Sequence, residues 1–363
     1  MARQPQARNT PGFMRLSLLQ RRFVFFMLLV GGVLIIVAIT LGLFAITSNS
    51  GRSQPIALLP EVAVGVLAEL PDNDAFPAAV ALGPDESVYT GSFATGAVWR
   101  IDADGSVTEI PGTREAIGGV SALAVLADGS LLVLDTIDTD ARTGGGALLR
   151  ILPDGTTETY AVAPDSRGFI SPNDLAIDAQ GRVYVSDGGR GDVLRFTPSA
   201  DGTVEAESWW SAPPAPDNGL TSLTGLAYDA GRDALIITDP ETNVVYRVAI
   251  SDGATETLYA HGQMPNAPGF DGAVVTPDGA VYVAALGQNG IARVNTETGT
   301  LDYIAGLFRG SSDIEYQPGS GRFIVPNFDQ ASLVIPLLSA SLPFTIDTVT
   351  LNPEAQPEAT PPA

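Results

Sequence analysis

The sequence predicts an all-β fold, a six-bladed β-propeller preceded by a single N-terminal transmembrane helix. Three observations lead to this prediction. A run of 24 residues without a charge lies near the N-terminus. A pair of short apolar strands around a turn then recurs six times. No helical periodicity interrupts the repeats, and repeats of 40 to 50 residues built of four strands are typical of propellers.

The N-terminal segment predicts a membrane anchor. Residues 1–22 contain five Arg and no acidic residue, and the apolar run covers residues 23–46. At a rise of 1.5 Å per residue this run reaches about 36 Å, enough to cross a hydrocarbon core of about 30 Å. The Arg cluster predicts a cytoplasmic N-terminus and an extracytoplasmic propeller in the cell membrane. A cleaved, unusually long signal peptide is the alternative to this signal-anchor.

The repeats define the expected propeller, residues 61–350, between a polar linker (47–60) and a Pro-rich tail (351–363) that is expected to be disordered. The six copies begin at Ala78, Ser121, Asn173, Thr224, Asp271 and Ser312. Each copy reads as an apolar strand, a turn with Asp or Gly, and a second strand.

Each of the first five copies continues with a third strand that carries an Arg, followed by a tight turn and a fourth strand. These are Arg100, Arg150, Arg195, Arg247 and Arg293. Because they recur in every blade, we expect them to be structural rather than catalytic. In the sixth copy the segment ASLVIPLL (331–338) takes the place of the third strand and lacks the Arg. Either residues 62–70 or residues 343–351 are expected to close the ring.

Composition excludes several classes of site. The chain has no Cys and a single His, His261, and all its basic residues are Arg. A disulfide framework, a Cys-ligated zinc, a Schiff-base lysine and a Walker-type phosphate loop are therefore absent. Residues 47–363 contain 14 Arg against all 41 acidic residues, a net charge of −27. Such a surface repels nucleic acid, so we expect a small-molecule substrate or a cell-envelope protein as the partner.

The starts of the inner strands are the best candidate site. In a propeller these positions converge near the central axis, and five of the six carry a polar residue. Asn, Asp, Ser and Thr also start strands simply by capping turns, which is the structural alternative for each position taken alone. A ring of oxygen ligands of this kind suits a hard divalent cation, with Ca²⁺ the first choice.

Two blades resemble a known family. PNDLAIDAQGRVYVSD (172–187) and FDGAVVTPDGAVYVAA (270–285) are similar to the senescence marker protein/gluconolactonase (regucalcin-like) family. The resemblance implies a divalent-metal-dependent hydrolase that opens sugar lactones. It implies metal ligands at Asn173 and Asp271, with Ser121 in place of a blade 2 Asn. The blade 1 Glu of the family falls near Ala75, where Asp74 is the adjacent carboxylate and a candidate third ligand.

The resemblance also assigns roles. Asp271 is the candidate catalytic residue, which accepts the proton of the attacking water, and Ser121, Thr224 and His261 are candidate substrate-binding residues. A lone His is more often an ordinary loop residue. The missing blade 1 Glu favours the alternative function, a non-enzymatic propeller that binds a ligand or an envelope partner.

Overall fold

The computed structural model describes residues 17–48, 54–136, 145–215, 219–262, 265–335 and 338–352. The chain divides into an N-terminal helical unit and the propeller. Most of the basic N-terminus, the middle of the expected linker (49–53) and nearly all of the expected disordered tail lie outside the described residues.

The N-terminal unit is one long helix, α1 (Leu18–Ser48). Its start is capped by Ser17 and Gln20. The backbone nitrogen of Gln20 donates to Ser17 Oγ, and the backbone nitrogen of Ser17 donates to Gln20 Oε1. This reciprocal pair satisfies two backbone donors that a helix start leaves free. The stretch Leu18–Gly42 is long and apolar enough to cross a membrane, a test that a signal sequence also passes.

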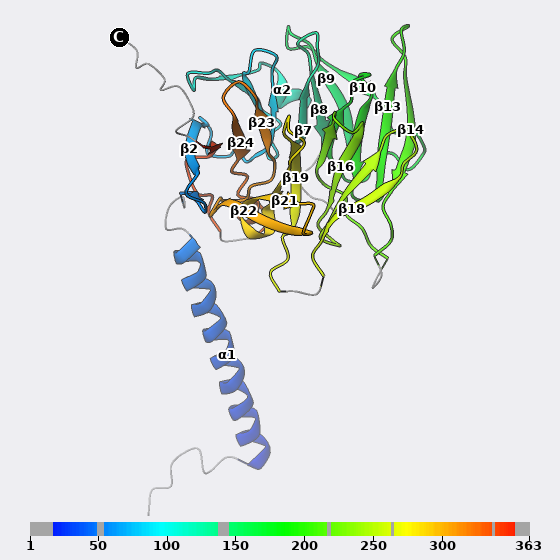
Figure 1. Cartoon of the computed structure of the whole chain (residues 1–363). Coiled ribbons are helices and arrows are strands. Elements are labelled where there is room, and N and C mark those ends of the chain that lie inside the picture. The colour runs from blue at the N-terminus through cyan, green and yellow to red at the C-terminus, as the bar shows by residue number, and fades with distance from the viewer. Residues whose placement is uncertain are drawn as a thin grey trace, which may run out of the picture. The chain divides into compact units, whose positions relative to one another are not determined.

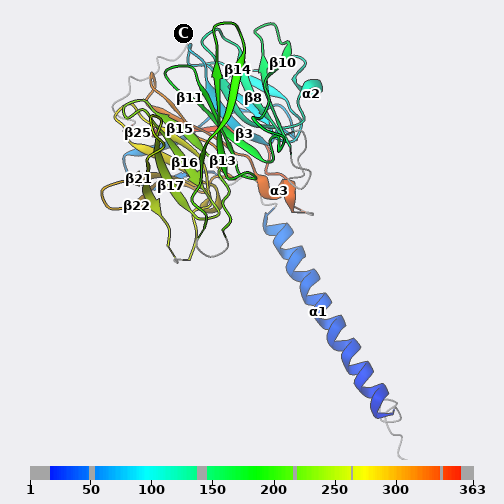
Figure 2. The same ribbon diagram turned by 90° about the vertical axis from the view of Figure 1, so that its right-hand side faces the viewer.

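The second unit is the predicted propeller, six antiparallel sheets that follow one another along the chain (Figures 1 and 2). Five of the sheets contain four strands and the sheet of blade 5 contains five. Apart from that extra strand and the ring closure, the strands follow sequence order from the centre outwards. The first three blades are β3 (Pro77–Leu82), β4 (Val88–Ser92), β5 (Val98–Ile101) and β6 (Val107–Glu109); β7 (Val120–Val125), β8 (Leu131–Asp135), β9 (Ala147–Ile151) and β10 (Thr157–Ala161); β11 (Pro172–Ile177), β12 (Val183–Asp187), β13 (Asp192–Pro198) and β14 (Val204–Ser211). The next two are β15 (Leu226–Asp229), β16 (Ala234–Asp239), β17 (Val244–Ala249) and β18 (Thr255–Ala260); β19 (Phe270–Val275), β20 (Val281–Ala285), β21 (Gly290–Asn295) and β22 (Thr300–Gly306).

The sixth blade closes the ring with strands from both ends of the propeller. It consists of β23 (Glu315–Gln317), β24 (Arg322–Pro326), β25 (Thr345–Leu351) and β2 (Val62–Glu69), and β2 pairs with β25 as the outermost strand. Figure 1 shows the blue β2 on the same side of the domain as the orange β23 and β24. Both candidate closing segments are therefore used, one as the third strand and one as the fourth.

One strand assignment from the sequence is wrong. The segment 331–338 does not form the third strand of blade 6, because Gln330–Val334 is a short helix, α3. The expected linker also contains a two-residue strand, β1 (Ile56–Ala57), which extends blade 5 by pairing with the end of β22.

The core lies between neighbouring blades. Trp99, Phe344 and Ile346 pack in one such cluster between blades 1 and 6, and all three side chains are fully buried. Four of the five repeated Arg side chains make ion pairs within their own blades, for example Arg100 with Asp85 and Arg195 with Glu207. These exposed pairs are worth little individually, so the apolar seams between the blades hold the ring together.

Candidate functional site at the channel mouth

The inner strands begin at one end of the central channel, and two cavities open there. The first has a volume of about 200 Å³ and is lined by Ser121, Asn173, Asp174, Asp271 and Asp313, with Phe93 and Phe328 among its apolar residues. The second, of about 510 Å³, is lined by Thr224, Arg309 and Asp329. Asn173, Asp271 and Gln330 line both cavities, which therefore form one continuous site.

Asn173 and Asp271 are two polar side chains at this mouth that no described residue engages. They stand on the inner strands β11 and β19, two blades apart. Both are half-buried, and neither side chain makes a hydrogen bond or an ion pair with a described residue. A half-buried polar group without a partner is costly unless a ligand or water satisfies it.

Asp174 and Asp313 line the same cavity but are fully engaged. Asp174 Oδ2 accepts a hydrogen bond of 2.7 Å from the Leu226 backbone nitrogen in blade 4, and Oδ1 accepts one from Leu175. Asp313 repeats this arrangement, with 2.8 Å to the Val80 nitrogen in blade 1. Each carboxylate thus ties one blade to the next. The sequence signal for both is an Asp directly after the polar residue that starts the copy.

The axis of the ring leaves little room at these positions. A Cβ added to Gly225 would lie 2.1 Å from the Asp271 carbonyl oxygen. One added to Gly272 would lie 2.4 Å from an Asp313 carboxylate oxygen. Glycine is therefore required at the second inner position of blades 4 and 5, because any side chain there would push Asp271 and Asp313 out of place.

The pKa values of the carboxylates at the mouth are raised, first of all by burial. Burial raises the pKa of Asp271 well above its usual range, and the charge of Asp313 raises it further. Burial also raises the pKa of Asp174, with added repulsion from Asp313, and it raises the pKa of Asp313 to about 6. No basic side chain lines the first cavity among the described residues. Repulsion between unpaired carboxylates in a poorly solvated channel is what a cation would relieve.

A fourth carboxylate stands further down the channel. Glu315, at the start of β23, lines a cavity of about 410 Å³ formed by the middle parts of the inner strands. Burial and the charge of Asp313 raise its pKa to about 8. The acidic character of the channel therefore extends away from the mouth, which sequence reasoning did not anticipate.

The other predicted site residues have different environments. Ser121 Oγ donates to the Pro172 carbonyl at 3.3 Å, and Thr224 Oγ1 donates to the Phe270 carbonyl at 3.2 Å, so both brace adjacent blades while lining a cavity. Asp74 is exposed and lines neither cavity. His261 is buried with Nδ1 2.8 Å from the Tyr259 hydroxyl, and it also lines neither cavity.

The oxygen atoms at the mouth offer a divalent cation two protein ligands. The described residues contain no cluster of three or more His, Cys, Asp or Glu suited to a metal. Ala75, at the place of the blade 1 ligand, is fully buried and offers no oxygen from its side chain. The free Asn173 amide oxygen and the free Asp271 carboxylate remain, and both are the hard oxygen donors that Ca²⁺, Mg²⁺ and Mn²⁺ accept.

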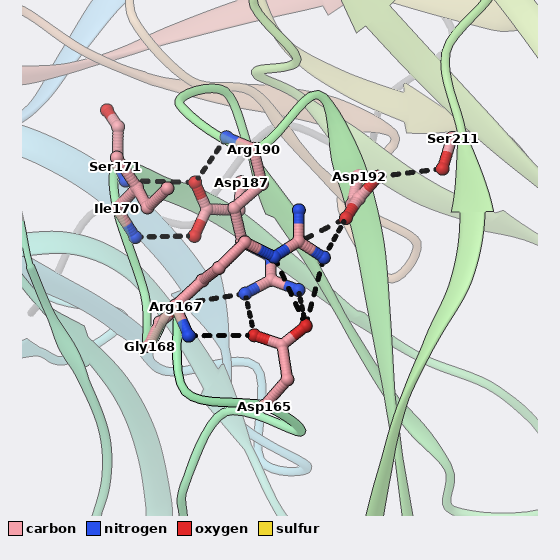
Figure 3. A network of polar contacts seen from close by, with 9 residues as sticks. All are labelled: Asp165, Arg167, Gly168, Ile170, Ser171, Asp187, Arg190, Asp192 and Ser211. Carbon is pink, nitrogen blue, oxygen red and sulfur yellow. Dashed lines mark hydrogen bonds and ion pairs between the residues drawn. The ribbon is translucent and has the colours of Figure 1, made fainter.

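A polar network fixes the segment that leads into Asn173 (Figure 3). The carboxylate of Asp187 accepts hydrogen bonds from the backbone nitrogens of Ile170 and Ser171, which line the first cavity. The fully buried guanidinium of Arg190 donates to both carboxylate oxygens of Asp165 and to the Gly168 carbonyl. The loop 165–171 is thereby held against the turn between β12 and β13 of its own blade.

The comparisons with known proteins agree with this architecture. A gluconolactonase from Xanthomonas campestris superposes with a TM-score of 0.59 at 16% identity, covering 83% of this chain and 96% of its own. A luciferin-regenerating enzyme gives 0.58 at 16% identity, covering 80% and 95%. A virginiamycin B lyase from Staphylococcus aureus gives 0.54 at 14% identity, covering 80% and 100%.

At these identities the solved structures establish the fold alone, and a search of curated proteins found no match. The family model described as "SMP-30/Gluconolactonase/LRE-like region" matches residues 121–306, just over half of the sequence. This match takes in blades 2 to 5, including Asn173 and Asp271. The chain belongs to the SMP-30/gluconolactonase/LRE-like family.

Proposed function

We propose that the propeller hydrolyses lactones at the channel mouth, with a divalent cation held by Asn173 and Asp271. The observation that carries the proposal is that these two side chains line the same site. They line both cavities, they lack protein partners, and Asp271 has a strongly raised pKa. Family membership supports the same activity.

The cation would be bound through the Asn173 amide oxygen and an Asp271 carboxylate oxygen, with Asp74 a further candidate only if its exposed loop moved. A bound cation supplies charge stabilisation for the carbonyl oxygen of an ester as it becomes negative. Ca²⁺ suits a site with few protein ligands because it accepts a variable number of oxygen ligands, including water.

The protein's own residues would carry the proton. A cation held by one carboxylate oxygen of Asp271 would leave the second oxygen free to act as a base. Asp271 would accept the proton of a water that attacks the lactone carbonyl carbon. As the ring C–O bond breaks, the same proton would return to the leaving oxygen, so the product is an open hydroxy acid. Ser121 and Thr224 would contact the substrate from the walls, whereas the position of His261 gives it no direct contact with either cavity.

The test is hydrolysis of five- and six-membered sugar lactones by the full chain in detergent, with Ca²⁺, Mn²⁺ or Mg²⁺ and after chelation. Asp271→Asn and Asn173→Ala should each lower kcat/KM at least about 100-fold, the loss typical of a site without its base or metal ligand. Glu205→Gln, at an exposed carboxylate on β14, is the matched control and should match the unchanged protein.

Hydrolysis that survives Asp271→Asn would contradict the proposal. Cation binding at Asn173 and Asp271 without hydrolysis of any lactone would instead support the alternative, a propeller that binds a ligand or an envelope partner.

We also propose that α1 anchors the propeller in the cell membrane, with the Arg-rich N-terminus in the cytoplasm and the propeller outside. Carbonate extraction of membranes and the mass of the extracted chain test this, because a cleaved signal sequence would release a shorter, soluble protein.

A further inference from the structure

The two ends of the propeller differ in chemistry. At the end opposite the mouth, turns join the first strand of a blade to the second and the third to the fourth. Six of these turns contain an Asp-Gly pair in which the Gly has a positive φ: 104–105, 128–129, 154–155, 201–202, 252–253 and 278–279. This far face therefore carries a ring of carboxylates.

The mouth face instead carries the exposed apolar side chains. Outside α1, ten large hydrophobic residues of the described propeller are exposed. One of them, Val66, lies within the outermost strand β2. The other nine lie at strand ends and connections around the mouth: Ile56, Leu58, Val162, Ile170, Leu220, Leu307, Val334, Ile335 and Leu342.

Six of these nine belong to blades 5 and 6, three beside the end of β22 and three in the connection from β24 to β25. Ile56 pairs with Gly306, next to Leu307, and Leu58 lies against the same glycine position. Val334 and Ile335 end the short helix α3, whose first residues line the second cavity. The Ser341 nitrogen, beside Leu342, donates to Asp329, which also lines that cavity. We call Ile56, Leu58, Leu307, Val334, Ile335 and Leu342 the apolar rim; each is 41–62% exposed.

The chain from the anchor enters the propeller at this rim. α1 ends at Ser48 and β1 begins at Ile56, in the rim itself. Eight residue steps span at most about 28 Å, so Ile56 lies no further than that from Ser48 along the chain. A short tether that ends among exposed apolar residues favours the membrane surface as the partner of those residues, because they are then held at high effective concentration beside it.

We propose that the apolar rim docks on the lipid bilayer, so that the channel mouth faces the membrane and the acidic far face points into solvent. The proposal rests on the anchoring of α1 proposed above and is independent of the lactonase activity. Burying apolar side chains in the interfacial region is favourable, whereas the far face, with its carboxylates, would be repelled by anionic lipid. Substrates would then reach the site from the membrane interface.

The absence of Cys from the chain allows a direct test. Leu307→Cys and Ile335→Cys place an environment-sensitive fluorophore on the rim, and Ser251→Cys and Thr296→Cys place the same fluorophore on exposed turns of the far face. The full-length variants are inserted into phosphatidylcholine nanodiscs, with or without a lipid that carries a spin label near the headgroup. The rim probes should show blue-shifted emission and strong quenching by the spin label, and the far-face probes should show neither.

Equal quenching at the two faces, or none at the rim, would overturn the proposal. A blue shift at the rim without quenching by lipid, which disappears on dilution to one chain per disc, would assign the rim to a second copy of the chain instead. A further variant, Leu307→Asp with Ile335→Asp, should abolish quenching at a probe on Leu342→Cys. Unchanged quenching there would also overturn the proposal. None of these readouts depends on hydrolysis, so failure here and failure of the lactonase activity remain distinct.

Discussion

The Asp174 carboxylate crosses from blade 3 to blade 4, where it accepts a 2.7 Å hydrogen bond from the Leu226 backbone nitrogen. Asp313 makes the equivalent bond to Val80 across the junction of blades 6 and 1. These two residues resemble their neighbours Asn173 and Asp271 in type and place, but their oxygens are consumed by the fold. The polar groups that the fold engages are thereby distinguished from those left free for a ligand.

Removing either of these inter-blade hydrogen bonds should destabilise the ring. Asp174→Ala and Asp313→Ala each leave backbone N–H groups without an acceptor, which costs about 1–3 kcal/mol per variant. Chemical denaturation followed by tryptophan fluorescence measures this loss. Asp271→Ala is the matched comparison, because its carboxylate bonds to no described residue, and it should cost less or even stabilise by removing repulsion. A larger loss in Asp271→Ala than in Asp174→Ala would contradict this account.

The raised pKa values predict how stability depends on pH in the metal-free protein. Asp313 shifts from 3.8 to about 6, and Glu315 shifts from 4.5 to about 8. Since the folded state binds these protons more tightly, their contribution is fully present below about pH 4 and is lost as pH rises toward 8. The melting temperature in chelator should therefore be higher at pH 5.5 than at pH 8.

Glu315→Gln should reduce this difference by raising the melting temperature at pH 8, because the side chain can no longer become charged. The exposed control Glu205→Gln should retain the full difference. A melting temperature that falls steadily from pH 8 to pH 5.5 in the unchanged protein would show that these channel acids do not govern its stability.

Cation binding should have the opposite pH dependence. A divalent ion needs Asp271 deprotonated, so its apparent affinity should rise with pH and binding should release protons. At about 100 times its dissociation constant the ion should stabilise the fold by about 2.7 kcal/mol. Calorimetric titration with Ca²⁺ in two buffers of different ionisation enthalpy measures the affinity and the proton release. Chemical denaturation with and without Ca²⁺ measures the stabilisation. Asn173→Ala and Asp271→Ala should abolish them, and binding that persists in both variants would place the ion elsewhere.

The buried Arg190 predicts a positioning effect on the site. Arg190→Ala would remove the buried guanidinium from Asp165 and Asp192 and leave the exposed Arg167 as their remaining partner, so the loop 165–171 should exchange its amide hydrogens faster. If the site hydrolyses lactones, KM should rise more than kcat falls, because Ile170 and Ser171 line the cavity. Arg190→Lys should rescue only part of the protection, since an ammonium cannot reproduce the fork that meets both oxygens of Asp165. Unchanged exchange in the loop would contradict this role.

The sequence by itself determined the propeller and the neighbourhood of Asn173 and Asp271. Strand patterns repeated at a regular spacing have one compact solution, and equal positions in equal blades must meet at the axis. Ring closure needed the tertiary structure. Residues 62–69 and 345–351 are both plausible outer strands, and only their pairing with each other shows that β25 is third and β2 fourth. The segment 331–338 is apolar enough for a strand, but its place was already taken by β25.

Tertiary structure alone also decided which polar residues remain free for a ligand. Asp174 and Asp313 could not be told from ligands by sequence, because the backbone N–H groups that donate to their carboxylates lie in the next blade. Asp74 and His261 lie close in sequence to the inner strands. In the structure, however, Asp74 is exposed to solvent, and His261 is hydrogen-bonded to the Tyr259 hydroxyl. A repeat pattern fixes where a backbone runs. The hydrogen bonds that consume a side chain depend on neighbours far away in the sequence.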